Sequence, residues 1–132
     1  MTSMLMLSAM LAAAPVGPGA EADWVAFLDH DDGSTSYYDR AGVQRDGQIV
    51  RVWVRWDRSS ESEPPFEEGR ILDELDCSAG TVRILRFGAY RGDGTELARR
   101  DSPLESAAVI ENTPGGALSE ILCPAQPAAS GK

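Results

Sequence analysis

The chain has 132 residues and a formal net charge of -9, and 7% of its residues are aromatic. This length accommodates one domain with a single core. The negative charge disfavours binding to nucleic-acid phosphates or to anionic lipid surfaces. We therefore expect no nucleic-acid partner. Beyond the N-terminus no apolar run is long enough to predict a membrane span.

The first 22 residues have the pattern of a secretory signal peptide. An apolar run from Met4 to Ala14 leads into a proline- and glycine-rich stretch, and Ala20-Glu21-Ala22 forms an Ala-x-Ala cleavage site. A buried core helix is the weaker alternative, because the run is short and prolines set it apart. We expect a signal peptide over 1–22, a domain over 23–124 and a disordered tail over 125–132. No cysteine stands near the cleavage site, so no N-terminal lipid is expected.

The stretch from Gln48 to Asp57 has the period-two alternation of a central β-strand. One side carries Val50, Val52, Val54 and Trp56, and the other carries Ile49, Arg51, Trp53 and Arg55. The second side, which mixes apolar and charged residues, is typical of a sheet face that is partly exposed to solvent or covered by an amphipathic element. Arg51, Trp53 and Arg55 form the candidate partner surface. Trp53 could be an exposed platform, but we favour its burial under a helix, because tryptophan is usually well buried.

Further strands and one helix are predicted around this strand. The chain between Arg40 and Asp46 is expected to be a polar connection, and the serine- and proline-rich stretch from Arg58 to Gly69 a surface loop. Thr113-Pro114 is typical of a helix start. The fold class is α+β, an antiparallel sheet of about six strands with a C-terminal helix on one face. The additional strands are Asp23 to Leu28, Tyr37-Tyr38, Arg70 to Cys77, Thr81 to Tyr90 and Thr95 to Arg100.

Four arginines are expected to lie on two adjacent strands, where only one pair need share a face. Cross-strand pairs with Asp73 or Glu74 would make this a solvated sheet face. The arginines are Arg51, Arg55, Arg83 and Arg86.

Two cysteines, Cys77 at a strand end and Cys123 at the helix end, predict one disulfide in an exported chain. The bond would tie the helix to the sheet. A metal or redox pair is the alternative, but the two cysteines lack the Cys-x-x-Cys spacing of such sites.

Short motifs spread from Trp24 to Cys123 carry a family resemblance. They are Asp23-Trp24-Val25, Tyr38-Asp39, Val50-x-Val52-Trp53-Val54, Asp76-Cys77, Tyr90-x-x-x-Gly94 and Pro114-Gly115 with Cys123. In order and spacing they resemble the surface-adhesin protein E-like domains of Gram-negative bacteria. The resemblance implies export, the sheet and disulfide-tied helix described above, and attachment to host matrix or serum proteins. One departure is that Ala107, Ala108 and Val109 stand where a tryptophan is expected.

His30, the only histidine, is the candidate for a general base or a metal ligand. Its neighbours Asp29, Asp31 and Asp32 cannot all face one ion from a turn, and no Gly-x-Ser-x-Gly accompanies it. A hairpin turn is the better interpretation. Arg91-Gly92-Asp93 is likewise interpreted as a turn rather than an integrin-binding tripeptide. We expect no enzyme activity, no metal and no cofactor.

The sequence thus predicts an exported, non-catalytic binding module. Its expected partner is an extracellular or envelope protein, and its expected location is secreted, periplasmic or on the cell surface. The alternative is a periplasmic structural or accessory domain of the envelope. Pairing of open sheet edges would allow a homodimer.

Overall fold

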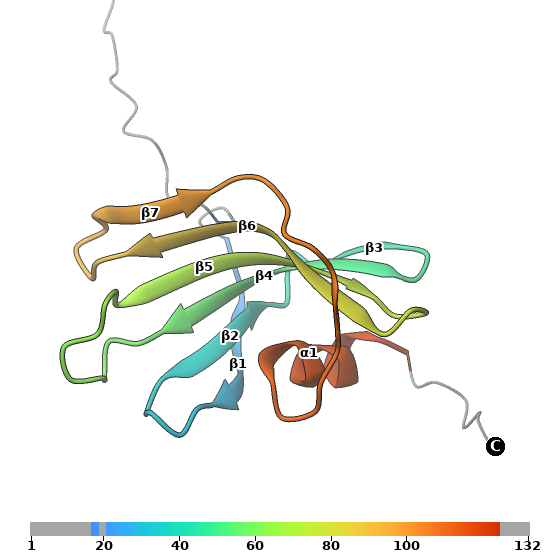
Figure 1. Ribbon diagram of the computed structural model, residues 1–132, viewed down its shortest axis with the longest axis horizontal. Coiled ribbons are helices and arrows are strands. Elements are labelled where there is room, and N and C mark those ends of the chain that lie inside the picture. Colours follow the sequence, from blue (N-terminus) through green and yellow to red (C-terminus); the bar gives the residue numbers. More distant parts are fainter. Residues whose placement is uncertain (1–16, 19–20, 125–132) are drawn as a thin grey trace, which may run out of the picture.

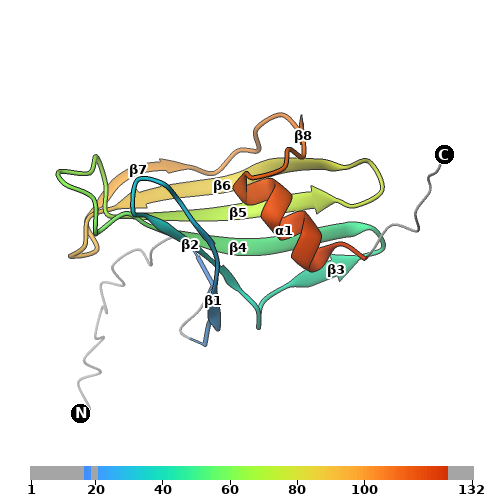
Figure 2. The ribbon, with the colours of Figure 1, turned by 90° about the horizontal axis from the view of Figure 1, so that it is seen from below.

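A computed structural model describes residues 17–18 and 21–124. It shows an antiparallel sheet with one helix lying across one face (Figures 1 and 2). The predicted leader falls mostly, and the predicted tail over 125–132 entirely, outside these residues. The elements are β1 (Trp24–Asp29), β2 (Thr35–Asp39), β3 (Gln44–Asp46), β4 (Ile49–Asp57), β5 (Glu68–Asp76), β6 (Thr81–Tyr90), β7 (Glu96–Arg100), β8 (Ala107–Ala108) and α1 (Pro114–Leu122).

The main path of the sheet runs in the order β1-β2-β4-β5-β6-β7, which confirms the predicted architecture. β4 is the central strand, and it pairs with β5 along its whole length, from Ile49 opposite Asp76 to Asp57 opposite Glu68. The predicted polar connection before β4 contains the short strand β3, which pairs with β4. β8 pairs with β6. These two strands are short and exposed, so they lack the alternation that marks a strand in sequence.

The core lies between α1 and the face of the sheet that it covers (Figure 2). Alternation along β4 places Val50, Val52 and Val54 on this face, each at most 2% exposed. Leu118 of α1 is fully buried against them. Burying one such side chain contributes about 1.5–3 kcal/mol, so this face supplies much of the stability.

The start of α1 follows the predicted chemistry. Thr113 is the N-cap, and its Oγ1 accepts a hydrogen bond from the Gly116 amide at 3.1 Å. Pro114 occupies the first turn, where its missing N–H costs nothing. Gly116 is needed because a Cβ there would collide with the carbonyl oxygen of Ile110. Glycine weakens an isolated helix, but here it lets the first turn pack closely.

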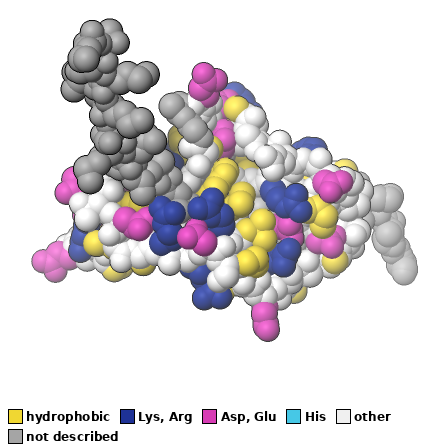
Figure 3. Space-filling model, turned by 90° about the horizontal axis from the view of Figure 1, so that it is seen from above, with side chains coloured by type: hydrophobic (Ala, Val, Ile, Leu, Met, Phe, Trp, Pro, Cys, Tyr) yellow, Lys and Arg dark blue, Asp and Glu magenta, His cyan; other side chains and the backbone are white. Residues whose placement is uncertain are grey.

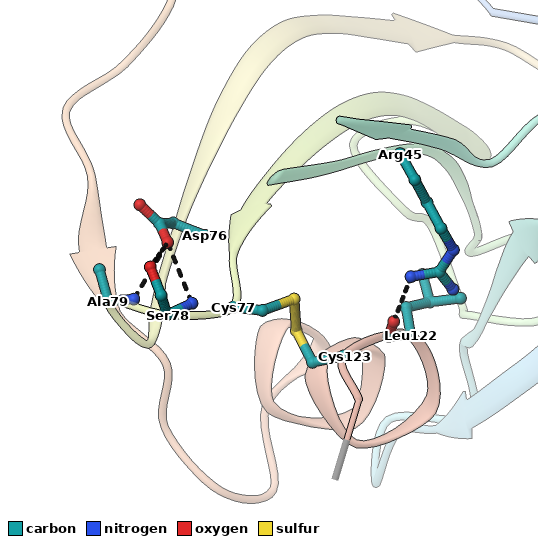
Figure 4. The surroundings of a disulfide bond; sticks show 7 residues. All are labelled: Arg45, Asp76, Cys77, Ser78, Ala79, Leu122 and Cys123. Atoms are coloured by element: carbon teal, nitrogen blue, oxygen red, sulfur yellow. Dashed lines mark hydrogen bonds between the residues drawn. A yellow bond between two sulfur atoms is a disulfide. The ribbon is translucent and has the colours of Figure 1, made fainter. Parts of the chain in front are cut away.

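Two contacts hold the end of α1 (Figure 4). The Cys77–Cys123 disulfide is formed, as predicted, and joins the end of β5 to the residue after the helix across 46 positions of sequence. Arg45 of β3 donates from Nη1 to the Leu122 carbonyl oxygen at 2.7 Å. A cation at a helix C-terminus interacts favourably with the helix dipole. The strand that the sequence did not reveal therefore caps the helix.

Candidate functional site

The candidate partner residues Arg51, Trp53 and Arg55 lie on the face of β4 opposite to the core. Val52 and Val54, their neighbours in sequence, belong to the helix-covered core, and side chains alternate along a strand. Trp53 therefore does not lie under α1, and the expectation that the helix buries it was wrong. It is half-buried among neighbouring side chains, with the Arg86 guanidinium 5.9 Å from its ring centre.

The expected arrangement of the four arginines was also wrong. β5 lies between β4 and β6, so Arg51 and Arg55 are not on a strand adjacent to Arg83 and Arg86. The register of β5 against β6 shifts between Leu72 and Asp73. This bulge brings both Arg83 and Arg86 to the helix-free face, although three positions separate them and regular alternation would place them on opposite faces.

Glu74 of β5 connects the arginines of the two flanking strands. Its Oε2 accepts from Arg51 Nε and its Oε1 from Arg83 Nε, both at 2.8 Å. Partial burial acts to raise the pKa of Glu74, but the bonds from Arg83 and Arg51 outweigh it and lower this pKa. Glu74 thus makes the predicted cross-strand pairs, whereas Asp73 lies on the core side. One carboxylate shared by two arginines leaves positive charge and unused guanidinium donors at the surface.

A second cluster lies further along the same face. Arg55 stands directly opposite Arg70 on β5, and Glu68 approaches both, with Oε1 3.3 Å from Arg55 Nη1 and Oε2 3.0 Å from Arg70 Nε. The Arg70 contact is an ion pair without hydrogen-bond alignment, because that Nε has no hydrogen-bond partner. The Arg55 guanidinium stacks 4.4 Å from the Tyr37 ring centre, and that of Arg70 lies 5.3 Å from Trp24.

We call these side chains together the arginine–aromatic face. Figure 3 views the molecule from the side away from α1 and shows arginines interleaved with apolar and acidic side chains on this face. Three of the arginine side chains are well exposed, with 40% of Arg51 and 39% each of Arg83 and Arg86 accessible. Arg55 and Arg70 are less exposed, at 24% and 20%. Such a surface combines apolar area with donors for carboxylates and carbonyls. Its members are Trp24, Tyr37, Arg51, Trp53, Arg55, Arg70, Leu72, Arg83 and Arg86.

His30 lies in the turn between β1 and β2, as expected, and its Nε2 is 2.8 Å from Ser36 Oγ. Ser36 is 2% exposed and sits in the middle of a regular strand, without the strained turn of a hydrolase nucleophile. Asp32 instead accepts hydrogen bonds from Ser34. Across the described residues, no group of three His, Cys, Asp or Glu side chains could hold a metal ion.

Arg91-Gly92-Asp93 forms the turn from β6 to β7. The Gly94 amide donates to the Arg91 carbonyl at 2.9 Å, and Asp93 Oδ1 accepts from the Thr95 amide. The Arg91 side chain forms an ion pair with Glu67, in the loop between β4 and β5. These bonds confirm a structured turn at the place where the sequence predicted one.

A model of the surface-adhesin protein E family matches residues 24–124, from the first residue of β1 to two residues past the end of α1. No curated protein and no solved structure was found to match the chain. None of the helices in the described ranges is long and apolar enough to cross a membrane. The family match covers most of the chain, including both cysteines and all strands of the arginine–aromatic face. The chain therefore belongs to the surface-adhesin protein E family.

Proposed function

We propose that the protein is an exported adhesin that binds an extracellular protein through the arginine–aromatic face, without catalysis. Family membership supports a surface-binding, non-enzymatic role. The observation that carries the proposal is the half-buried Trp53, which α1 does not cover. It shares its face of β4 with Arg51 and Arg55, and the Arg86 guanidinium of β6 lies 5.9 Å from its ring centre. Tryptophan, tyrosine and arginine dominate the energetic centres of protein interfaces.

The charges on this face indicate the chemistry of the partner. The chain as a whole is acidic, with a net charge of -9, yet on this face five arginines outnumber the carboxylates paired with them. Those carboxylates are Glu74, Glu68, Asp57 and Asp101. Arg55 and Arg70 are like charges directly opposite each other, and Glu68 lies between them, with Asp57 3.9 Å from Arg55. A carboxylate of a partner would add charge-assisted hydrogen bonds to the guanidinium donors that these anions leave free. We therefore propose an acidic segment carrying apolar side chains as the ligand.

Removal of the predicted leader would enlarge this face. Gly17 lies against Arg70, since a Cβ built on it would be 2.8 Å from Arg70 Nη1. Cleavage before Asp23 would take Gly17 away and expose more of the Arg70 guanidinium. This supports a mature protein in which the arginine–aromatic face is more accessible than in the full chain.

The test is a binding screen of the purified protein against immobilised matrix and serum proteins by biolayer interferometry. For any ligand found, Trp53→Ala and the double variant Arg51→Gln/Arg55→Gln should weaken binding about tenfold or more, as for interface centres. Ile121→Ala and Arg40→Gln are matched controls, because both residues are exposed and lie outside this face. Equal binding by all four variants would contradict the proposed surface.

The compartment requires a separate experiment, because the alternative is a periplasmic accessory domain of the envelope. Protease shaving of intact producing cells, with medium and periplasm probed by non-reducing mass spectrometry, separates the two. Adhesion requires protein that is shaved from cells or found in the medium. Protein protected in the periplasm would rule adhesion out. The same samples, passed through size-exclusion chromatography, test the homodimer that pairing of the edge strands β1 or β7 would form.

A further inference from the structure

The helix-covered side of the sheet contains a cavity that the proposed adhesive surface does not use. It has a volume of about 580 Å³ and lies between β4, β5, β6 and the start of α1. This volume is within the range of small-molecule binding sites. Its lining is mainly apolar and includes Val54, Ile71, Val82, Ile84, Leu104 and Pro114.

One carboxyl group, that of Asp73, lies among these apolar side chains. Asp73 is 7% exposed, faces the core side of β5 between Ile71 and Leu75, and stands opposite Val52 on one neighbouring strand and Ile84 on the other. In the part of the chain that the structure describes, no side chain or backbone group donates a hydrogen bond to its carboxyl and no cation pairs with it. Burial raises the pKa of Asp73 to about 7. An unpartnered buried carboxyl costs stability, so its presence calls for an explanation.

The other charged groups around the cavity do not neutralise Asp73. Arg83 contributes to the lining, but its guanidinium is held by Glu74 on the opposite face of the sheet. His30 is engaged with Ser36, and Glu105 adds a second acidic group at the exposed rim. The cavity is therefore apolar and acidic, and it lacks a cation of its own.

We propose that this cavity binds a small apolar amine, with the ammonium group against Asp73 and the hydrocarbon part against Ile71, Val82 and Ile84. The ammonium would supply the opposite charge that the chain does not, and the hydrocarbon would fill the apolar volume. This site lies on the other side of the sheet from the arginine–aromatic face, so the two binding activities are separable by mutation.

The test uses hexylamine as the probe and the uncharged hexan-1-ol as its matched counterpart, titrated into the purified full chain by calorimetry at pH 8. At this pH the amine is protonated and Asp73 is mostly ionised. Hexylamine should bind about tenfold or more tightly than hexan-1-ol, as expected for a hydrogen-bonded charge. Equal affinities, or no saturable binding by the folded protein, would overturn the proposal.

Three variants locate the site. Asp73→Asn keeps the shape but removes the charge, so it should abolish the preference for hexylamine over hexan-1-ol. Asp46→Asn removes an exposed carboxylate on β3 and should leave both affinities unchanged. Ala107→Trp places a large side chain at the rim of the cavity and should weaken both probes. Retained preference in folded Asp73→Asn would refute the role of Asp73, whatever the outcome of the matrix-binding screen.

A pH series on the unmodified protein gives an independent check. Affinity for hexylamine should fall as the pH is lowered from 8 to 5, because protonation of Asp73 removes the charge that holds the ammonium. Hexan-1-ol should show no such fall. Because His30 and Glu105 also line the cavity, the same series on Asp73→Asn identifies the responsible group. A fall that persists in this variant would contradict the proposal.

Discussion

The two faces of the sheet are made by the same strands but differ in what covers them. The face under α1 is built from the valines that alternate along β4 and from leucines of β5 and α1, and it contains the unpartnered Asp73. The opposite face carries Trp53 and five arginines, which outnumber the four carboxylates paired with them. The covered face supplies most of the apolar burial that stabilises the fold. The open face contributes less to stability, because exposed ion pairs are weak, and it is the face that we propose binds a partner.

Among changes to the covered face, removing the disulfide should lower the free energy of unfolding most. Replacing Cys77 and Cys123 together by serine should lower the free energy of unfolding by about 4 kcal/mol, the chain-entropy value for a loop of 46 residues. Urea denaturation under non-reducing conditions measures it. The wild-type protein with its disulfide reduced is the matched control and should lose a similar amount. An unchanged midpoint would mean that packing alone holds α1 on the sheet.

The pH dependence of the free energy of unfolding should show the raised pKa of Asp73. Its folded-state pKa of about 7 lies above the ordinary value of 3.8, so folding binds a proton that the unfolded chain releases. The stabilisation is complete below about pH 4 and is lost as the pH rises through 7, with a limit of about 4 kcal/mol. Urea unfolding of wild type and Asp73→Asn between pH 4 and 8 measures the difference. A constant difference between the two would show that Asp73 ionises normally.

Truncating the helix contact should come next in size. Leu118→Ala removes a fully buried side chain from the interface of α1 and β4, and should cost about 3 kcal/mol. Ile121→Ala is the matched control on the same helix, because Ile121 is 47% exposed, and it should change stability by less than about 0.5 kcal/mol. Thermal and urea unfolding of both variants would test the assignment of the covered face. Equal effects would contradict it.

The smallest loss of stability is expected for a substitution on the open face. Glu74→Gln removes the charge shared by Arg51 and Arg83 and should lower stability by about 1 kcal/mol, since the Glu74 side chain is 11% exposed but solvent reaches about 40% of each arginine side chain and screens the pairs in part. Its consequence for binding should be clearer, because two arginines would gain free donors and bind an acidic ligand more tightly. Weaker ligand binding by Glu74→Gln than by wild type would contradict the proposed charge preference.

Most of the covered face could be predicted from the sequence. The alternation of Val50, Val52 and Val54 indicated the central strand and one apolar side of it, and Thr113-Pro114 marked the helix start. The pairing of Cys77 with Cys123 followed from the count of cysteines and the predicted export. The strand and the helix start depend on interactions between residues close in sequence. The disulfide could be predicted because two cysteines allow one pairing.

The open face was predicted only in part. The sequence pointed to Arg51, Trp53 and Arg55, but it did not reveal Trp24, Tyr37 and Arg70 as their neighbours. Those contacts depend on the register between strands that are distant in sequence. Similarly, β3 and β8 are stabilised by pairing with β4 and β6 and not by their own residue pattern.

By itself, the sequence determined the six main strands, the helix, the disulfide and the family resemblance, because the periodicity and the spacing of residues can be read directly from the chain. Tertiary structure decided which face α1 covers, and hence that Trp53 is on the open face and Asp73 on the covered one. It also decided, through a bulge in β6, that Arg83 and Arg86 share a face. Alternation states that two sets of side chains lie on opposite faces, but only packing selects which set is buried, since both contain large apolar residues.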